Sequence, residues 1–273
     1  LAQTKSWIKE LDEETGRVHG YVNPNGAVTS RMTHSHPNMA QIPSSSSPYG
    51  EDCRSCWTVP ENYRLVGIDA AQLELRMLAH YLNDKDYTNE ILNGDIHTTN
   101  QRLAELESRD KAKTFIYALL YGAGDAKLGS VVGRGRAVGK GLRQRFFDNL
   151  PAFKKLTDRV QREAKSGFVK GLDGRKLTVR SEHAALNTLL QGAGSIVMKQ
   201  ALIVLNNKIA KHGYDAKFVA NVHDEWQIEC SIDDAVDVGK LGVLALREAG
   251  CMFKLNCPLD GAYKVGENWS ETH

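Results

Sequence analysis

The sequence predicts an α+β fold, and three stretches carry this prediction. Residues 217–230 form two short runs that alternate apolar and polar side chains, with acidic residues between them, which is typical of a hairpin. Residues 63–69 read as a strand that ends in an acid and passes into a helical pattern over 72–82. Residues 109–124 repeat charged and aromatic side chains every four positions, as along one face of a helix.

Length and composition favour a globular protein. The 273 residues suffice for one large or two modest domains, and 41% hydrophobic with 25% charged residues is typical of a soluble chain. No apolar run approaches the roughly 20 residues of a membrane span, and the first eleven residues are too polar for a signal peptide. The five cysteines are irregularly placed and fit no zinc pattern, which favours reduced thiols in a cytoplasm.

Charge is distributed unevenly along the chain. Residues 97–180 contain 19 Lys and Arg against 8 Asp and Glu, a net charge of +11, while the remainder carries −9. This pattern suggests one lobe that meets a polyanion and another that holds cations. A solvated basic face explains the basic segment equally well.

The acids within 217–230 are best placed at the tip of a hairpin. In one unbroken strand, Asp224 would share the apolar face with Val222 and Trp226, at a large desolvation cost. A turn removes this conflict and presents Asp224 and Glu225 as adjacent carboxylates on a rigid support, which suits a divalent metal ion. An ordinary solvated acidic turn is the alternative.

The helix predicted over 109–124 carries a stripe of functional side chains. Arg109, Lys113, Tyr117 and Tyr121 fall within one stripe about 18 Å long. Two cations followed by two aromatic rings suit a ligand with phosphates at one end and a flat base at the other. Alternatively, the tyrosines face the core and the cations are solvated.

The glycine-rich run 129–141 does not fit a phosphate-binding loop. Arg134 and Gly141 occupy positions where the motif requires Gly and Ser or Thr, so a flexible basic loop is predicted. Residues 171–175 read as a turn between short strands, and 183–206 as a helix carrying Asn187 and Gln191 on one face. The segment 232–273 reads as a helix followed by a strand.

Three ordered motifs resemble those of the family A DNA polymerases, the group of bacterial DNA polymerase I. The segment VGIDAAQLELR (residues 66–76) is similar to their motif A, R-x3-K-x3-Y-x3-YG from Arg109 to their motif B, and VHDE (222–225) to their motif C. Flanking stretches such as NPNGAVTSRMTH and GLDGRKLTVRS resemble the replicative polymerases of short-tailed T-odd bacteriophages more closely still.

The resemblance implies a polymerase palm, an antiparallel sheet with helices, and an inserted, mainly helical fingers subdomain. The palm would comprise residues 1–88 and 185–273, and the fingers 89–184. Only 68 residues precede Asp69, too few for the thumb and the 3′–5′ exonuclease of such enzymes. The chain is therefore expected to be the palm and fingers of a longer polymerase, without a processivity partner on this portion.

The implied activity is DNA-templated DNA synthesis in viral DNA replication. Deoxynucleoside triphosphates would be added to a primer 3′-hydroxyl on a primer–template, with release of pyrophosphate and with two Mg²⁺ ions (Mn²⁺ being possible). Asp69 and Asp224 would hold both ions, the backbone carbonyl of Ala70 would add a ligand, and Glu225 would be a lesser third carboxylate. No membrane is expected, and the location would be the cytoplasm of the host cell.

The resemblance also assigns roles along motifs A and B. Arg109, Lys113 and His97 would contact the nucleotide's phosphates, with Lys113 as a proton donor to the pyrophosphate. Tyr121 would lie near the base and sugar, and Tyr117 near the 3′ side of the sugar, where many bacterial relatives have Phe. Ready acceptance of dideoxynucleotides is expected. Glu74 would crowd the 2′ position and exclude ribonucleotides, and Gln72 completes the nucleotide-binding set.

Further matching positions imply contacts with DNA near the primer terminus: Arg31, His183, Asn187, Gln191 and His223. Arg31 and Gln191 would probe minor-groove acceptors, which test base-pair geometry rather than sequence. The basic middle would bind the template strand and close over the nucleotide, and binding should depend strongly on salt.

Two other classes of function remain open. A metal-dependent nuclease also needs clustered carboxylates, but hydrolysis has no use for a triphosphate-binding stripe. A nucleic-acid-binding fragment with weak or no catalytic activity is the other alternative.

Overall fold

The structure is a computed structural model that describes residues 2–273. The chain divides into two compact units. The sheet unit comprises the residues to Leu73, Ser195–Lys254 and Pro258–His273, and the helical unit comprises Glu74–Gly194 and Leu255–Cys257. These boundaries differ from the divisions predicted after residues 88 and 184, and the assignment of palm and fingers to them stays a prediction.

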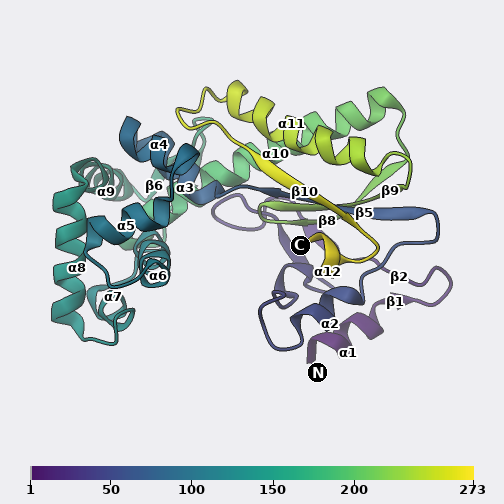
Figure 1. Cartoon of the computed structure of the whole chain (residues 1–273), viewed down its shortest axis with the longest axis horizontal. Helices are drawn as coiled ribbons and strands as arrows, with labels where there is room; N and C mark the ends of the chain where they lie inside the picture. The colour runs from purple at the N-terminus through teal and green to yellow at the C-terminus, as the bar shows by residue number, and fades with distance from the viewer. Residues whose placement is uncertain (1) are drawn as a thin grey trace. The chain divides into compact units, whose positions relative to one another are not determined.

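A four-stranded antiparallel sheet is the centre of the sheet unit (Figure 1). Its order is β10 (Gly261–Gly266), β5 (Tyr63–Ala70), β9 (Glu225–Ser231) and β8 (Ala216–Val222). The predicted hairpin is confirmed, because β8 and β9 pair antiparallel across a two-residue turn, with a register shift after Phe218. The α+β class is confirmed as well.

Strand β9 is buried on both faces, whereas the sequence alternation predicted burial on one face. Trp226 and Ile228 point to one side, and Gln227 and Glu229 to the other, and all four are buried. The buried polar groups have partners, since Glu229 pairs with Arg17 at 2.8 Å and Gln227 accepts a hydrogen bond from Thr272 at 2.8 Å. Polar residues in a strand therefore do not mark a solvent face here.

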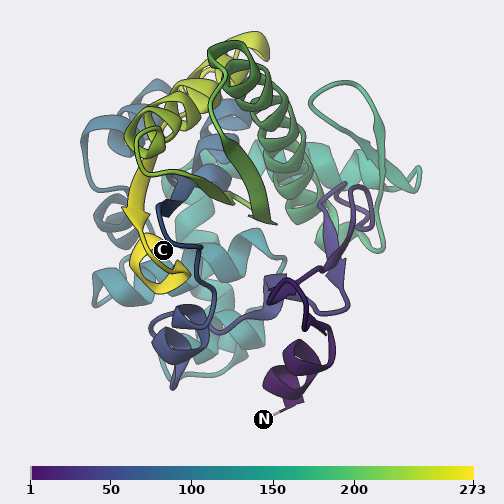
Figure 2. The same ribbon diagram turned by 90° about the vertical axis from the view of Figure 1, so that its right-hand side faces the viewer.

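Helix α11 (Ala235–Met252) covers one face of this sheet (Figure 1). It approaches closely because two of its residues, Gly239 and Gly242, have no side chain. A Cβ at Gly242 would lie 2.2 Å from Ile68 Cδ1, and one at Gly239 would lie 2.2 Å from the Tyr263 ring. The N-terminal segment lies on the side of the sheet away from α11 (Figure 2).

The N-terminal segment is made of short elements that pack with the end of the chain. It contains α1 (Ala2–Lys9), the paired strands β1 (Leu11–Asp12) and β2 (Arg17–Val18), the paired strands β3 (Tyr21–Asn23) and β4 (Thr33–Ser35), the 3-10 helix η1 (Met39–Gln41) and α2 (Gly50–Ser55). Buried Trp7, Ile42 and Leu65 form an apolar cluster with Trp269. Trp269 begins the C-terminal helix α12 (Trp269–Thr272).

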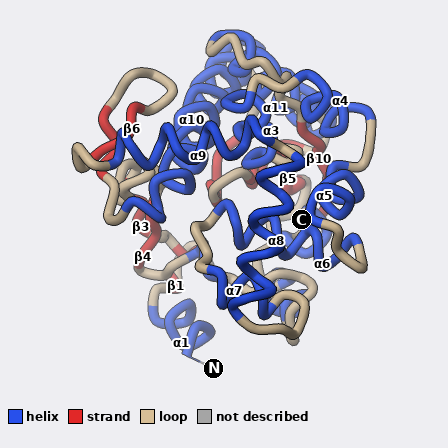
Figure 3. Tube along the Cα trace, turned by 90° about the vertical axis from the view of Figure 1, so that its left-hand side faces the viewer, coloured by secondary structure: helices blue, strands red, loops and turns tan. Residues whose placement is uncertain are grey.

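Helices make up most of the helical unit (Figure 3). They include most of α3 (Leu73–Leu82), then α4 (Lys85–Asn93), α5 (Ile96–Ala104), α6 (Arg109–Leu120), α7 (Asp125–Ser130), α8 (Arg136–Asn149) and α9 (Pro151–Ala164). A hairpin of β6 (Phe168–Lys170) and β7 (Lys176–Thr178) and the 3-10 helix η2 (Glu182–Ala184) follow. Phe146 meets Phe115 and Phe153 edge-on at 5.7 and 5.2 Å between ring centroids, a favourable geometry for aromatic packing.

The glycine-rich run corrects one prediction. Residues 136–141, predicted as part of a flexible loop, are the first turns of α8. Gly139 is buried there, and a Cβ at this position would lie 1.8 Å from the carbonyl oxygen of Asp125. The glycines therefore allow α7 and α8 to pack closely, and only the short turn between these helices is irregular.

Helix α10 (Ala185–His212) is longer than the predicted 183–206. By length and composition alone, residues 182–212 could cross a membrane, contrary to the expectation that no stretch would qualify. However, 72% of the apolar window is buried within the protein, as in a core helix.

Candidate active site

Strand pairing brings the acids of the first and third motifs together. Asp69 is the penultimate residue of β5 and pairs in register with Glu225, the first residue of β9. The backbone N–H of Ala70 donates to the carbonyl oxygen of Asp224 at 3.0 Å. Asp69 and Asp224 therefore lie at one end of the sheet, although 155 positions separate them in the sequence.

The electrostatics of this carboxylate pair favour a bound cation. The side chain of Asp69 reaches solvent, but surrounding protein atoms, then Asp224 and Glu225, raise its pKa to about 6. Burial also raises the pKa of Asp224, which is half-buried in the turn. A cation here would relieve both the repulsion between carboxylates and the cost of their desolvation.

The available ligands suit magnesium better than a metal held entirely by protein. Within residues 2–273, no group of three or more His, Cys, Asp or Glu side chains is arranged to hold a metal ion. Magnesium in nucleotide enzymes commonly uses one or two carboxylates and takes its other ligands from substrate phosphates and water. Asp69 and Asp224, with the nearby carbonyl of Ala70, fit this pattern.

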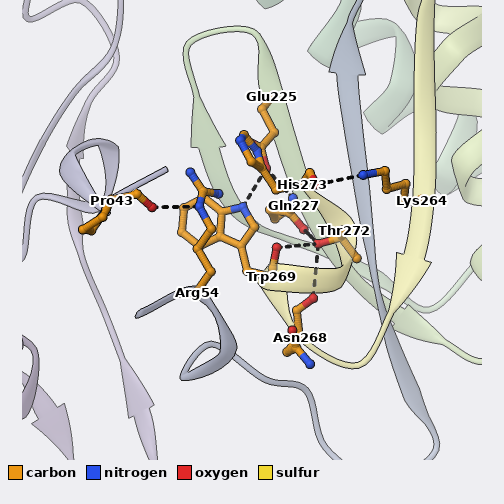
Figure 4. A network of polar contacts seen from close by, with 9 residues as sticks. All are labelled: Pro43, Arg54, Glu225, Gln227, Lys264, Asn268, Trp269, Thr272 and His273. Carbon is orange, nitrogen blue, oxygen red and sulfur yellow. Dashed lines mark hydrogen bonds and ion pairs between the residues drawn. The ribbon is translucent and has the colours of Figure 1, made fainter. Parts of the chain in front are cut away.

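Glu225 is engaged differently from the other two acids, through partners that Figure 4 shows. It is 4% exposed, and its Oε1 accepts hydrogen bonds from Gln227 and from Trp269 Nε1. Its Oε2 lies 2.8 Å from His273 Nδ1. Burial would raise the pKa of Glu225, but the hydrogen bond and charge of His273, with these donors, hold that pKa below its usual value. The catalytic role predicted for Glu225 stays a prediction.

The predicted stripe of cations and tyrosines is present in the helical unit. Arg109, Lys113 and Tyr117 lie on α6, and Tyr121 is its C-terminal cap. Arg109 and Lys113 are exposed, Tyr117 is half-buried, and Tyr121 is 50% exposed. The ring centroids of Tyr117 and Tyr121 are 6.3 Å apart. The alternative in which both tyrosines face the core is wrong, because other α6 residues, among them Phe115 and Ile116, are the buried ones.

Two carboxylates already contact this stripe. Asp95 caps the N-terminus of α5 by accepting from the backbone N–H of His97 at 3.1 Å, and it binds Arg109 at 2.6 and 3.2 Å. The Arg109 hydrogen bond is the main reason that the pKa of Asp95 is well below its usual range. Glu74 accepts a hydrogen bond from the Tyr121 hydroxyl at 2.9 Å.

His97 is buried beside the stripe. It is 7% exposed, and its ring centroid lies 6.3 Å from that of Tyr117. Burial, then the charges of Arg109 and Lys113, lower the pKa of His97. Its Nδ1 is buried and has no hydrogen-bond partner within the part of the chain that the structure describes.

The residues predicted to contact DNA fall into two groups. In the sheet unit, Arg31 and His223 line one pocket, together with Met32, Ser195, Met198, Lys199 and Asn221. In the helical unit, His183 is exposed on η2, while Asn187 and Gln191 are half-buried one turn apart on α10. Gln72, assigned to nucleotide binding, is exposed between β5 and α3 with a left-handed φ of 50°.

Sequence reasoning missed several neighbours of these residues. Lys199 Nζ and Ser195 Oγ both donate to the carbonyl oxygen of Ser30 at 2.6 Å, next to Arg31. Ser195 and Lys199 lie four positions apart within the predicted helix, and this spacing indicates that they share one face. Nothing in the local pattern indicated Trp269 or Arg54, because their contacts join distant segments.

A family model described as "DNA polymerase family A" matches residues 2–271. The chain belongs to this family. It is 45% identical to the DNA-directed DNA polymerase of Enterobacteria phage T3 and 44% identical to that of Escherichia phage T7, over 98% of this chain and 43% of each relative. It is 33% identical to DNA polymerase I of Aquifex aeolicus over 97% of this chain and 48% of that enzyme.

A solved structure shares the fold. The POL domain of Pol1 from M. smegmatis, in complex with DNA primer-template and dNTP, superposes with a TM-score of 0.90 at 24% identity. The match covers 99% of this chain and 51% of that one. The family A chain described here thus spans less than half the length of the curated relatives it matches.

Proposed function

We propose that this family A protein synthesises DNA on a template, adding deoxynucleotides to a primer 3′-hydroxyl and releasing pyrophosphate, in viral DNA replication. The observation that carries the proposal is the pairing of β5 with β9, which brings Asp69 beside Asp224 at the end of the sheet. The phage relatives, named DNA-directed DNA polymerase, support the same activity.

The sheet unit would supply the acidic half of the chemistry. Asp69, Asp224 and the carbonyl of Ala70 would hold two divalent ions, Mg²⁺ or Mn²⁺, which lower the pKa of the primer hydroxyl and stabilise charge on the phosphates. Glu225, with both oxygens bound by protein donors, would hold the hairpin tip in place. Arg31 and His223 would contact the primer–template beside these acids.

The helical unit would bind the triphosphate. Arg109 and Lys113 would hold its phosphates, with Lys113 giving a proton to the leaving pyrophosphate. To do so, Arg109 would exchange Asp95 for a phosphate oxygen. The buried and largely neutral His97 would donate a hydrogen bond to the phosphate tail.

Selection of the sugar and base would follow from the rest of the stripe. Tyr117 would meet the 3′ side of the sugar, and Tyr121 the base and sugar. Glu74, held by the Tyr121 hydroxyl, would occupy the space of a ribose 2′-hydroxyl, and Gln72 would complete the nucleotide contacts. His183, Asn187 and Gln191 would contact DNA near the primer terminus.

Two observations support a location in the cytoplasm of a bacterial host. The relatives come from phages and bacteria, and all five cysteines are free, which supports action in the cytoplasm of a bacterial host.

Primer extension with Mg²⁺ tests the proposal, using the wild-type protein with Asp69→Asn and Asp224→Asn. The wild type should lengthen a labelled primer only when deoxynucleotides are present, and both variants should lose this activity. Shortening of the primer would indicate a nuclease, and DNA binding without a change in primer length would indicate a binding protein. Equal extension by all three proteins would contradict the assignment of the acids.

A further inference from the structure

Arg54 is buried in an environment that packing alone does not explain. It lies in α2 with 6% of its surface exposed. Its Nε donates to the carbonyl oxygen of Pro43 at 2.9 Å, while its Nη1 is buried without a hydrogen-bond partner among residues 2–273. Burying a guanidinium in this way costs free energy, so the charge needs a compensating interaction.

The compensating interaction is with Trp269. The guanidinium carbon lies 4.8 Å from the centroid of the Trp269 ring, within the range of a cation–π contact. At the edge of the same ring, Nε1 donates to Glu225 Oε1 at 2.6 Å. A cation over the face of an indole draws electron density from the ring, which makes its N–H a stronger donor to an anion. The indole therefore links the cation to the carboxylate (Figure 4).

Glu225 transmits this constraint to the carboxylates at the end of the sheet. It follows Asp224 directly and pairs with Asp69 across β5 and β9. Its two oxygens accept from Trp269, Gln227 and His273, and a carboxylate bound from these sides has little freedom to rotate. Any displacement of Glu225 would move the backbone of Asp224, whose carbonyl oxygen binds Ala70.

We propose that Arg54 is a positioning residue for nucleotidyl transfer, which acts through the Trp269 indole to hold Glu225, and thereby to fix the spacing of Asp69 and Asp224. The inference rests on the proposed function. A purely structural role for Arg54 would affect only the stability of the fold. The proposed role predicts in addition that this buried cation of the N-terminal segment affects the rate of the chemical step.

Arg54→Met is the main test, because Met fills similar space without the charge. Its kcat in primer extension should fall about tenfold, since small misplacement of reacting groups costs about this much or more. KM for deoxynucleotides should stay within about twofold, since the proposed phosphate contacts lie in the helical unit. Arg54→Lys, which keeps a cation over the ring, should recover part of the loss.

Arg64→Met is the matched control and should change neither constant. Arg64 is half-buried on β5. It donates to the carbonyl oxygen of Tyr63 and forms an ion pair with Glu267, and both contacts lie outside this network.

Trp269→Phe tests the contribution of the indole N–H separately from that of the aromatic face. Phe keeps an aromatic face for Arg54 but cannot donate to Glu225, so kcat should fall as in Arg54→Met. Because both substitutions release the same carboxylate, the double variant should be no slower than the slower single variant. An unchanged kcat in Arg54→Met, or losses that multiply in the double variant, would overturn the proposal.

Thermal unfolding of the same proteins without substrate distinguishes this inference from the proposed function. Arg54→Met should lower Tm, because removing one charged member of a buried network leaves its partners uncompensated, and a single cooperative transition would show that the variant still folds. The shifts in Tm of Arg54→Met and Glu225→Gln should be strongly non-additive in the double variant. If the wild-type protein extends no primer, the proposed function fails. The non-additivity of the Tm shifts still tests whether Arg54 and Glu225 are coupled through Trp269. Additive Tm shifts would then refute the network.

Discussion

The end of the sheet and the exposed face of α6 are built in opposite ways. Strand pairing fixes Asp69 and Asp224 side by side, and crowding raises the pKa of both. On α6, Arg109 and Lys113 are exposed on a helix surface, and Arg109 already binds Asp95. The acids are thus held in place against their mutual repulsion, whereas the cations are exposed side chains on a helix surface, one of which is paired with Asp95.

This difference predicts different kinetic consequences. A fixed pair of acids that repel each other gains most when a metal ion binds, so a change there should affect the chemical step and kcat. A substitution in the stripe on α6 should instead change which nucleotide binds and how tightly. Such a change is measured as a different KM or a different selectivity. The substitutions below test this contrast, from the largest expected effect to the smallest.

Asp224→Asn should have the largest effect, a loss in kcat of about a thousandfold or more, because it removes the proposed metal-binding charge, which would be worth several kcal/mol in the transition state. KM for deoxynucleotides should change by no more than about threefold. Steady-state primer extension measures both constants, with Asp237→Asn, an exposed acid on α11, as the control. A change confined to KM would contradict the contrast.

Tyr117→Phe should raise discrimination against dideoxynucleotides by about a hundredfold, because the phenolic hydroxyl would make the polar contact near the sugar's 3′ side. The rate with ordinary deoxynucleotides should stay nearly unchanged. Competition between each deoxynucleotide and its dideoxy analogue on one primer measures the ratio, and Tyr121→Phe on the same stripe is the control. Unchanged discrimination would refute the assignment of Tyr117.

Glu74→Ala should increase ribonucleotide incorporation about tenfold, because it vacates the space proposed for the 2′-hydroxyl. Glu74→Gln keeps the volume and should retain most of the exclusion. Alkali-sensitive sites in the product report the incorporated ribonucleotides. If the Gln variant admits as many ribonucleotides as the Ala variant, charge rather than volume excludes them.

Asp95→Asn should have the smallest effect, a fall in KM for deoxynucleotides of about threefold at low salt, the range expected for an exposed ion pair. The amide oxygen of Asn can still accept from His97 N–H and preserve the helix cap, while Arg109 loses its anionic competitor. The difference should shrink as salt is raised. A higher KM would show that Asp95 orients Arg109 for the phosphate rather than competing with it.

Local pattern was enough to predict the elements that position the acids. The alternation over 217–230 and the strand-to-helix transition at Asp69 gave β8, β9, β5 and α3, because both depend on side-chain periodicity. Periodicity could not show that β9 is covered on both faces, since this depends on α11 and on the C-terminal segment. It also misassigned the glycine run, because Gly139 is required by the approach of α7, a contact outside the local pattern.

Local pattern predicted part of the candidate site, as it predicted part of the fold. The stripe on α6 follows from spacing alone, and the family motifs supplied roles for its members. The partners of the stripe and of Glu225 were not predictable. Asp95, Trp269 and Arg54 act through tertiary contacts, such as the one between Trp269 and Glu225, 44 positions apart.

Metal binding at the end of the sheet is the most direct measurement. Electron paramagnetic resonance of Mn²⁺, titrated into the protein with a dideoxy-terminated primer–template and the next deoxynucleotide, counts the bound ions. Two ions per chain are expected for the wild type, with loss of binding in Asp69→Asn and Asp224→Asn and little change in Asp237→Asn, an exposed acid on α11. Equal Mn²⁺ binding by the wild type and both Asn variants would show that these carboxylates do not hold the metal.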